Sequence, residues 1–153
     1  MLGYETSATA TAHCLLFLAM HPNVQNQMYE EITEVFTSND TKINNDTLSQ
    51  LKYMDRVIKE SMRVAPVGPV IFREALEDFE ITPGCVVPKG TTFILNIYGL
   101  HRSKELWGPN ALNFDPDNFL SENVTKRHPC SYIPFSTGRR NCIGNTVIIN
   151  STS

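Results

Sequence analysis

The sequence lacks any excess of positive charge. Its 153 residues include 13 lysines and arginines against 16 aspartates and glutamates, a formal net charge of −3 at pH 7. Because proteins that bind nucleic acids usually present a basic face, we expect no nucleic-acid partner. The four cysteines form no C-x-x-C pair and no histidine lies at zinc-finger spacing from them, which argues against structural zinc. No internal repeat is visible, so collagen-like and solenoid architectures are excluded.

A long hydrophobic run is also missing. Residues 6–29 contain no charged side chain, but their densely apolar part extends only from Cys14 to Met20. This is far shorter than the roughly 20 residues that a membrane-spanning helix needs. We therefore predict a helix that is buried on most sides within a larger protein, and we expect neither an anchor nor a secretory signal in this chain.

The cysteines leave one alternative open. Four cysteines and four N-x-S/T sequons would suit a secreted glycoprotein with two disulfides. About two sequons are expected by chance in a chain so rich in Asn, Ser and Thr, so this alternative has little support.

Hydrophobic residues make up 41% and charged residues 19% of the chain, an ordinary globular mixture. Apolar residues at helical spacing predict helices before Pro22, from Pro22 to Val35, and from Leu51 to Pro66. Asp46 or Thr47 is predicted to cap a short turn before the last helix. β-rich runs at residues 70–72, 79–81, 85–87 and 91–97 predict three or four strands, followed by a long irregular stretch. The predicted fold class is mainly α with a small antiparallel β-sheet.

The segment from Phe135 to Gly144 carries the most informative chemistry. Gly138 and Gly144 permit sharp turns that can direct backbone N–H groups toward the sulfur of Cys142. Arg140 and the arginine before it raise the local potential and favour the thiolate, and Phe135 can shield the sulfur from water. A single desolvated thiolate suits a haem-iron ligand. A glycine-rich turn with one buried cysteine is the alternative.

This segment resembles the haem-binding signature of the cytochrome P450 superfamily, F-x-x-G-x-R-x-C-x-G, at all five defined positions. The resemblance implies that Cys142 is the axial ligand of the haem iron. It also assigns four further positions to cofactor binding: Phe135, Gly138, Arg140 and Gly144.

Glu60 and Arg63 resemble the E-x-x-R pair of the same superfamily. Their i,i+3 spacing places both on one helical face, where a charge-assisted pair can form, although an ordinary surface ion pair is the alternative. The resemblance implies a structural role, in which an arginine of a P-x-R-F-like segment joins the pair. Asn118 stands at the place of that arginine, so a neutral amide replaces a cation here.

Two further sites follow from the resemblance. Residues 3–7 resemble the oxygen-activation motif, in which Glu5 and Thr6 would be catalytic because an acid followed by a hydroxyl can relay protons. The alternative is that both only begin or cap a helix. Arg73 stands where many members of the superfamily bind a haem propionate, with Arg140 as a second donor. A solvated charge opposite Glu74 or Glu77 is the alternative for Arg73.

The resemblance spans Gly3 to Gly144 and is greatest to the microsomal clan that includes fatty-acid hydroxylases and many insect enzymes. It implies a haem-thiolate monooxygenase that inserts one oxygen atom from O2 into a lipophilic substrate. Haem b would be the cofactor, and NADPH electrons would arrive through cytochrome P450 reductase, with cytochrome b5 as a second donor. The full-length family member would be attached to the endoplasmic reticulum membrane.

The limits of the resemblance suggest an incomplete haem domain. Residues 1–144 are predicted to be the C-terminal part of one haem domain, and residues 145–153 an irregular tail outside the family pattern. The N-terminal half and the proximal helix after the cysteine would be missing, so we expect the chain alone to bind haem weakly or not at all. The alternative function is therefore a truncated, catalytically inactive fragment.

Overall fold

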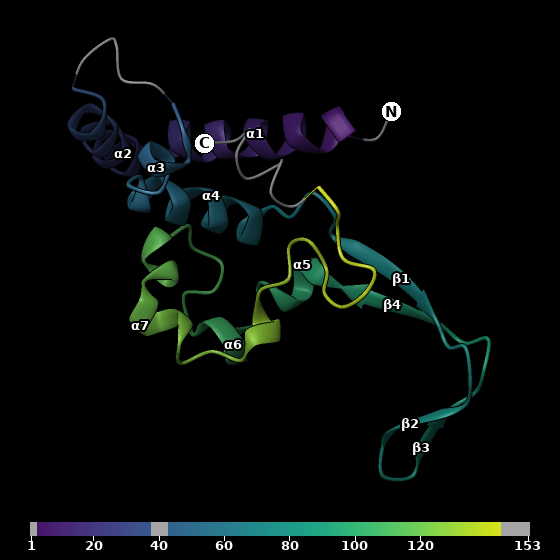
Figure 1. Cartoon of the computed structure of the whole chain (residues 1–153). Helices are drawn as coiled ribbons and strands as arrows, with labels where there is room; N and C mark the ends of the chain where they lie inside the picture. The colour runs from purple at the N-terminus through teal and green to yellow at the C-terminus, as the bar shows by residue number, and fades with distance from the viewer. Residues whose placement is uncertain (1–2, 38–42, 145–153) are drawn as a thin grey trace.

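The computed structural model describes residues 3–37 and 43–144 (Figure 1). The predicted irregular tail, residues 145–153, lies outside the described residues. The fold is mainly helical with short antiparallel strands, which confirms the predicted class. Its elements are, in order, α1 (Gly3–Met20), α2 (Pro22–Val35), α3 (Asn45–Leu48), α4 (Lys52–Val64), β1 (Val70–Glu74), β2 (Phe79–Thr82), β3 (Cys85–Val87), β4 (Thr92–Asn96), α5 (Ile97–Leu100), α6 (Lys104–Trp107), η1 (Pro116–Phe119), α7 (Ser121–Val124) and η2 (Pro129–Ser131).

Helix α4 is the centre of the molecule, with α1 and α2 packed against it (Figure 1). Nine of its 13 residues are buried, because apolar side chains recur along it at helical spacing. Val57 and Ile58 lie at the middle of the resulting core. This helix is therefore the support on which the neighbouring elements are arranged.

Helix α1 buries one stripe, formed by Ala10, Cys14 and Leu18 at intervals of four residues. Several of its other apolar side chains, including Leu15 and Met20, are more than half exposed in this chain. The predicted burial on most sides refers to a larger protein and stays a prediction. No described helix is both long enough and apolar enough to span a membrane.

Two helix starts depend on capping. Asn44 caps α3, since its Oδ1 accepts hydrogen bonds from the amides of Asp46 and Thr47 at 2.9 Å each. The prediction of Asp46 or Thr47 as the cap is therefore wrong, although Thr47 Oγ1 accepts a return bond from the Asn44 amide. At the start of α4, the apolar side chain of Leu51 cannot cap the helix. Glu31 of α2 instead accepts hydrogen bonds from amides in the first turn of α4.

All four predicted strands are present, but they pair as two separate antiparallel ladders. Strand β1 pairs with β4, and β2 pairs with β3. The turns at Gly84 and Gly90 both have φ near +82°, a conformation that favours glycine. In Figure 1 the β2–β3 hairpin extends away from the helices, and Val87 is its one buried residue.

The stretch predicted to be irregular, between residue 109 and Pro134, instead contains short helical turns around an aromatic cluster. Phe119 and Tyr132 lie edge to face, with ring centroids 4.7 Å apart. Trp107 and His101 complete this cluster. The prediction missed these three turns because turns of three or four residues show no hydrophobic periodicity.

Candidate functional site

One cavity of about 320 Å³ brings together residues from both ends of the sequence. It lies between the start of α1, the end of α4, strand β1 and the loop that contains Cys142. The lining is mostly apolar, and its polar groups are one thiol, two hydroxyls and two guanidiniums. The lining residues are Thr6, Ala10, Met62, Val67, Gly68, Ile71, Arg73, Ile97, Ile133, Pro134, Phe135, Ser136, Arg140 and Cys142.

The loop around Cys142 is closed by its own backbone. The amide of Cys142 donates to the carbonyl of Phe135 at 2.9 Å, and the amide of Asn141 donates to the carbonyl of Gly138 at 3.2 Å. Gly138 has φ of +81°, so the glycine of the motif is needed for the turn. A Cβ at Gly144 would lie 3.8 Å from the Cys142 sulfur, in ordinary van der Waals contact. The loop thus holds the half-buried Cys142 at the cavity wall.

Ser136 is a functional candidate that the sequence reasoning missed. It has φ of +61°, which is uncommon for a residue with a side chain. Its Oγ accepts a hydrogen bond from Arg73 Nη2 at 3.0 Å, a contact between residues 63 positions apart. Arg73 therefore stabilises the strained turn before Cys142. In the sequence, Ser136 is marked only by its place near a glycine-rich turn. This is a weak signal, because serine is common in turns.

The two arginines predicted to bind a cofactor carboxylate both line the cavity. Arg73 is half-buried on the face of β1 that also carries Ile71, and its Nη1 donates to the carbonyl of Phe72 at 2.8 Å. Arg73 is therefore not the fully solvated charge of the alternative interpretation. Arg140 is exposed on the cysteine loop.

The two residues predicted to relay protons lie in different environments. Thr6 is half-buried and lines the cavity, whereas Glu5 is exposed and is not among its lining residues. Both lie near the start of α1, which runs as an α-helix from Gly3 to Met20. A proton path through Glu5 would therefore have to pass between solvent and Thr6.

Glu60 and Arg63 form a fully buried pair rather than a surface one. Arg63 Nε and Nη2 donate to the two carboxylate oxygens of Glu60, both at 2.7 Å. The other N–H groups of Arg63 donate to three backbone carbonyls at 2.6 to 2.8 Å, so all five donors have an acceptor. These carbonyls belong to His101, Ala111 and Asn113. The pair therefore ties α4 to the segment that follows α5.

Glu60 reaches the same segment through its own acceptors. Its Oε1 accepts from the amide of Asp115 at 2.8 Å and from Asn118 Nδ2 at 3.1 Å. Asn118, the departure from the expected arginine, thus still contacts Glu60. The contact is a neutral hydrogen bond and supplies no charge.

His101 connects this buried pair to the cysteine loop. Its carbonyl accepts from Arg63, and its Nε2 accepts from the amide of Ile133 at 3.0 Å. The ring is fully buried, and burial together with the charge of Arg63 lowers its pKa to about 4. His101 is therefore a neutral acceptor near pH 7, and it holds the residue that precedes Pro134 and Phe135 in the cavity wall. Sequence reasoning assigned it no role.

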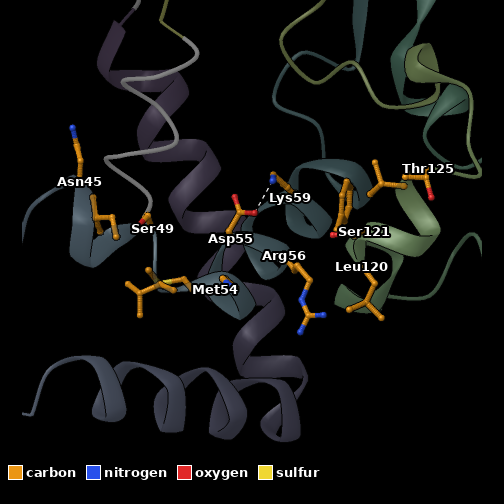
Figure 2. A pocket seen from close by; sticks show the side chains of 14 residues that line it. Asn45, Ser49, Met54, Asp55, Arg56, Lys59, Leu120, Ser121 and Thr125 are labelled. Atoms are coloured by element: carbon orange, nitrogen blue, oxygen red, sulfur yellow. Dashed lines mark hydrogen bonds and ion pairs between the residues drawn. The ribbon is translucent and has the colours of Figure 1, made fainter.

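A larger open cleft of about 960 Å³ lies between α3, α4 and α7 (Figure 2). Its described lining contains no cysteine and no histidine. Two basic side chains on its α4 wall already have acidic partners, since Lys59 pairs with Asp55 at 2.6 Å and Arg56 with Asp117 at 3.4 Å. The smaller cavity, where thiol, hydroxyl and guanidinium groups meet, is therefore the better candidate site.

The cysteines do not support the secreted alternative. Cys14, Cys85, Cys130 and Cys142 are all free thiols. Burial raises the pKa of Cys14 to about 11, so this thiol stays protonated near pH 7. Within the described ranges, no group of three or more His, Cys, Asp or Glu side chains could hold a metal ion.

Comparisons with known proteins agree on one family. The profile of the Cytochrome P450 family matches residues 1–147. "Probable cytochrome P450 313a1" of Drosophila melanogaster is 42% identical over 98% of this chain, and "Cytochrome P450 6B6" of Helicoverpa armigera is 40% identical over 93% of it. The chain spans 31% and 28% of the length of these two relatives.

Solved structures give the same result. The haem domain of a cytochrome P450DA mutant matches 99% of this chain with a TM-score of 0.89 and 32% identity. A second crystal structure of a cytochrome P450 matches 97% of the chain with the same TM-score and 34% identity. In both comparisons the chain covers 33% of the matched protein.

Proposed function

This chain belongs to the cytochrome P450 family, and we propose that it forms the cysteine side of the active centre of a haem-thiolate monooxygenase. Such an enzyme inserts one oxygen atom from O2 into an organic substrate, here a lipophilic one. The single observation that carries the proposal is the cavity in which Cys142, Arg73, Arg140 and Thr6 meet from distant parts of the chain. Each of these residue types suits one part of the chemistry.

The residues of the cavity fit a haem b group. Apolar side chains such as Ile71, Ile97 and Phe135 suit the faces of a porphyrin, and two guanidiniums suit its carboxylates. Cys142 is the one thiol in the described lining. When bound, the haem supplies the oxygen and electron-transfer chemistry, while the protein supplies binding and orientation.

Each residue at the cysteine side then has a defined task. Cys142 would ligate the iron as a thiolate, held by the loop that its amide closes on the Phe135 carbonyl. Gly138 would permit the turn of this loop, Gly144 would lie beside the Cys142 sulfur, and Phe135 would exclude water. Arg73 would bind one propionate while Ser136 holds its guanidinium in place.

Arg140 and the start of α1 complete the assignment. Arg140 would bind the second propionate from the rim of the cavity. The Thr6 hydroxyl can both donate and accept a proton inside the cavity, and Glu5 would exchange protons with solvent one residue earlier.

Partners and location follow from the family alone. We propose NADPH–cytochrome P450 reductase as the electron donor, with cytochrome b5 as a second donor. We also propose that the whole protein acts at the cytosolic face of the endoplasmic reticulum membrane.

The proposal is tested by reconstituting the chain with haem and recording its carbon-monoxide difference spectrum after reduction. Haem is supplied in excess because the chain alone is expected to bind it weakly; a thiolate-type Soret band is then expected, and Cys142→Ser should abolish it. Cys130→Ser, which changes an exposed cysteine 12 positions earlier, is the matched control and should leave the band unchanged. A chain without haem signal, or a band that survives Cys142→Ser, would contradict the proposal; the first result would favour the inactive fragment.

A further inference from the structure

Arg127 is a half-buried cation without a carboxylate partner of its own. In the part of the chain that the structure describes, no acidic side chain forms an ion pair with it within 4.0 Å. Its guanidinium carbon lies 4.1 Å from the ring centroid of Trp107 and 5.6 Å from that of Phe119. One Nη atom donates a hydrogen bond to the carbonyl of Asn118. A cation removed from water in this way needs a compensating charge.

The compensating charge available to Arg127 is Glu60. Burial lowers the pKa of Arg127, and the negative charge of Glu60 acts in the opposite direction. Asn118 links the two residues, since its carbonyl accepts from Arg127 and its Nδ2 donates to Glu60 Oε1 at 3.1 Å. The link runs from the backbone carbonyl of Asn118 to its side-chain amide, and both groups are neutral, so it adds no charge.

The geometry around Trp107 leads to the same conclusion. The guanidinium of Arg63 also lies over the Trp107 ring, 4.8 Å from its centroid. Two cations beside one indole repel each other, and Arg63 accordingly lowers the pKa of Arg127 as well. The arrangement is favourable only with the carboxylate of Glu60 close by, and Glu60 is fully buried.

We propose that Arg127 is the second cation of the Glu60 cluster (Glu60, Arg63, Trp107, Asn118 and Arg127) and that it positions the η1–α7 segment against α4. In this arrangement Arg127 supplies the charge that the neutral Asn118 does not. The same segment leads into η2 and the cysteine loop, so Arg127 is a positioning residue and touches no reacting group. The proposal does not require bound haem, so it can fail or hold independently of the proposed function.

The test is equilibrium unfolding in urea, followed by the fluorescence of Trp107, the one tryptophan of the chain. Arg127→Gln should lower the urea midpoint and raise the unfolding equilibrium constant roughly tenfold, as expected for a desolvated cation over aromatic rings. Lys126→Gln is the matched control, because it removes the same charge from an exposed neighbour. Its midpoint should equal that of the unchanged chain.

A second variant separates charge from packing. Asn118→Arg, added to Arg127→Gln, places a guanidinium where the Asn118 amide now reaches Glu60, and it should restore most of the lost midpoint. If Arg127→Gln behaves like the Lys126 control, or if the added arginine restores nothing, the proposal is overturned. If Arg127→Gln alone does not fold, the double variant still decides: a folded double variant supports the proposal, and an unfolded one refutes it.

Discussion

Single residues in this protein are determined by partners that lie far away in the sequence. The i,i+3 spacing of Glu60 and Arg63 predicts their ion pair, but it does not predict that both are fully buried. Arg63 is buried because carbonyls 38 to 50 positions away accept its remaining N–H groups. Without these acceptors, the same pair would lose more in desolvation than it gains in attraction.

His101 gives a pH-dependent prediction at this scale. Its pKa is about 4 in the folded protein against an ordinary 6.5, so the unfolded chain takes up the proton first as the pH falls. The stabilisation by neutral His101 is complete above pH 6.5 and is lost as the pH falls toward about 4, at a cost of up to ~3 kcal/mol in the free energy of unfolding. Urea midpoints across this range measure the loss.

His101→Gln is the control for this prediction. A glutamine can still accept from the Ile133 amide but does not titrate, so its midpoint should change less with pH over the same range. Equal pH dependence in both chains would show that other groups, and not His101, cause the acid sensitivity.

Whole elements depend on capping that crosses from one helix to another. Apolar periodicity and the positions of Pro22 and Pro66 predict α2 and α4 closely, because proline limits the backbone of the residue before it. The cap of α4 was not predictable, since it comes from Glu31 on α2. The carboxylate oxygens of Glu31 accept from the amides of Tyr53 and Met54 at 2.7 and 2.8 Å.

Replacing this cap should weaken α4. We expect Glu31→Ala to lower the free energy of unfolding by about 1–2 kcal/mol, because two amides at the start of α4 lose their acceptor. Thermal or urea unfolding measures the change. Glu30→Ala, at the exposed neighbouring glutamate, should cost much less, and equal losses in the two variants would contradict the capping role.

The molecule as a whole consists of a packed helical part and a hairpin that contributes little to the core. The sequence pattern predicts the four strands and their turns but not that they form two separate ladders. Strand propensity is a local property, whereas pairing depends on how the turns direct each strand. The β2–β3 hairpin buries one residue, while α4 buries nine.

Hydrogen exchange should reflect this difference. Amides of α4 (Lys52–Val64) should exchange slowest, because they open only when the core opens, and amides of the β2–β3 hairpin should exchange fastest among the paired strands. Mass spectrometry of peptic fragments measures both in one experiment. Equal protection of the two segments would show that the hairpin is part of the cooperative core.

The sequence by itself determined the helix boundaries at prolines, the strand positions, the cysteine loop and the shared face of Glu60 and Arg63. These features arise from backbone limits and side-chain spacing within a few residues. The tertiary structure alone decided the contacts of Arg73 with Ser136, of His101 with Ile133, and of Arg127 with Trp107. Each joins residues that are 20 or more positions apart. Such contacts form only after the core has brought their segments together and offset the entropy of ordering them.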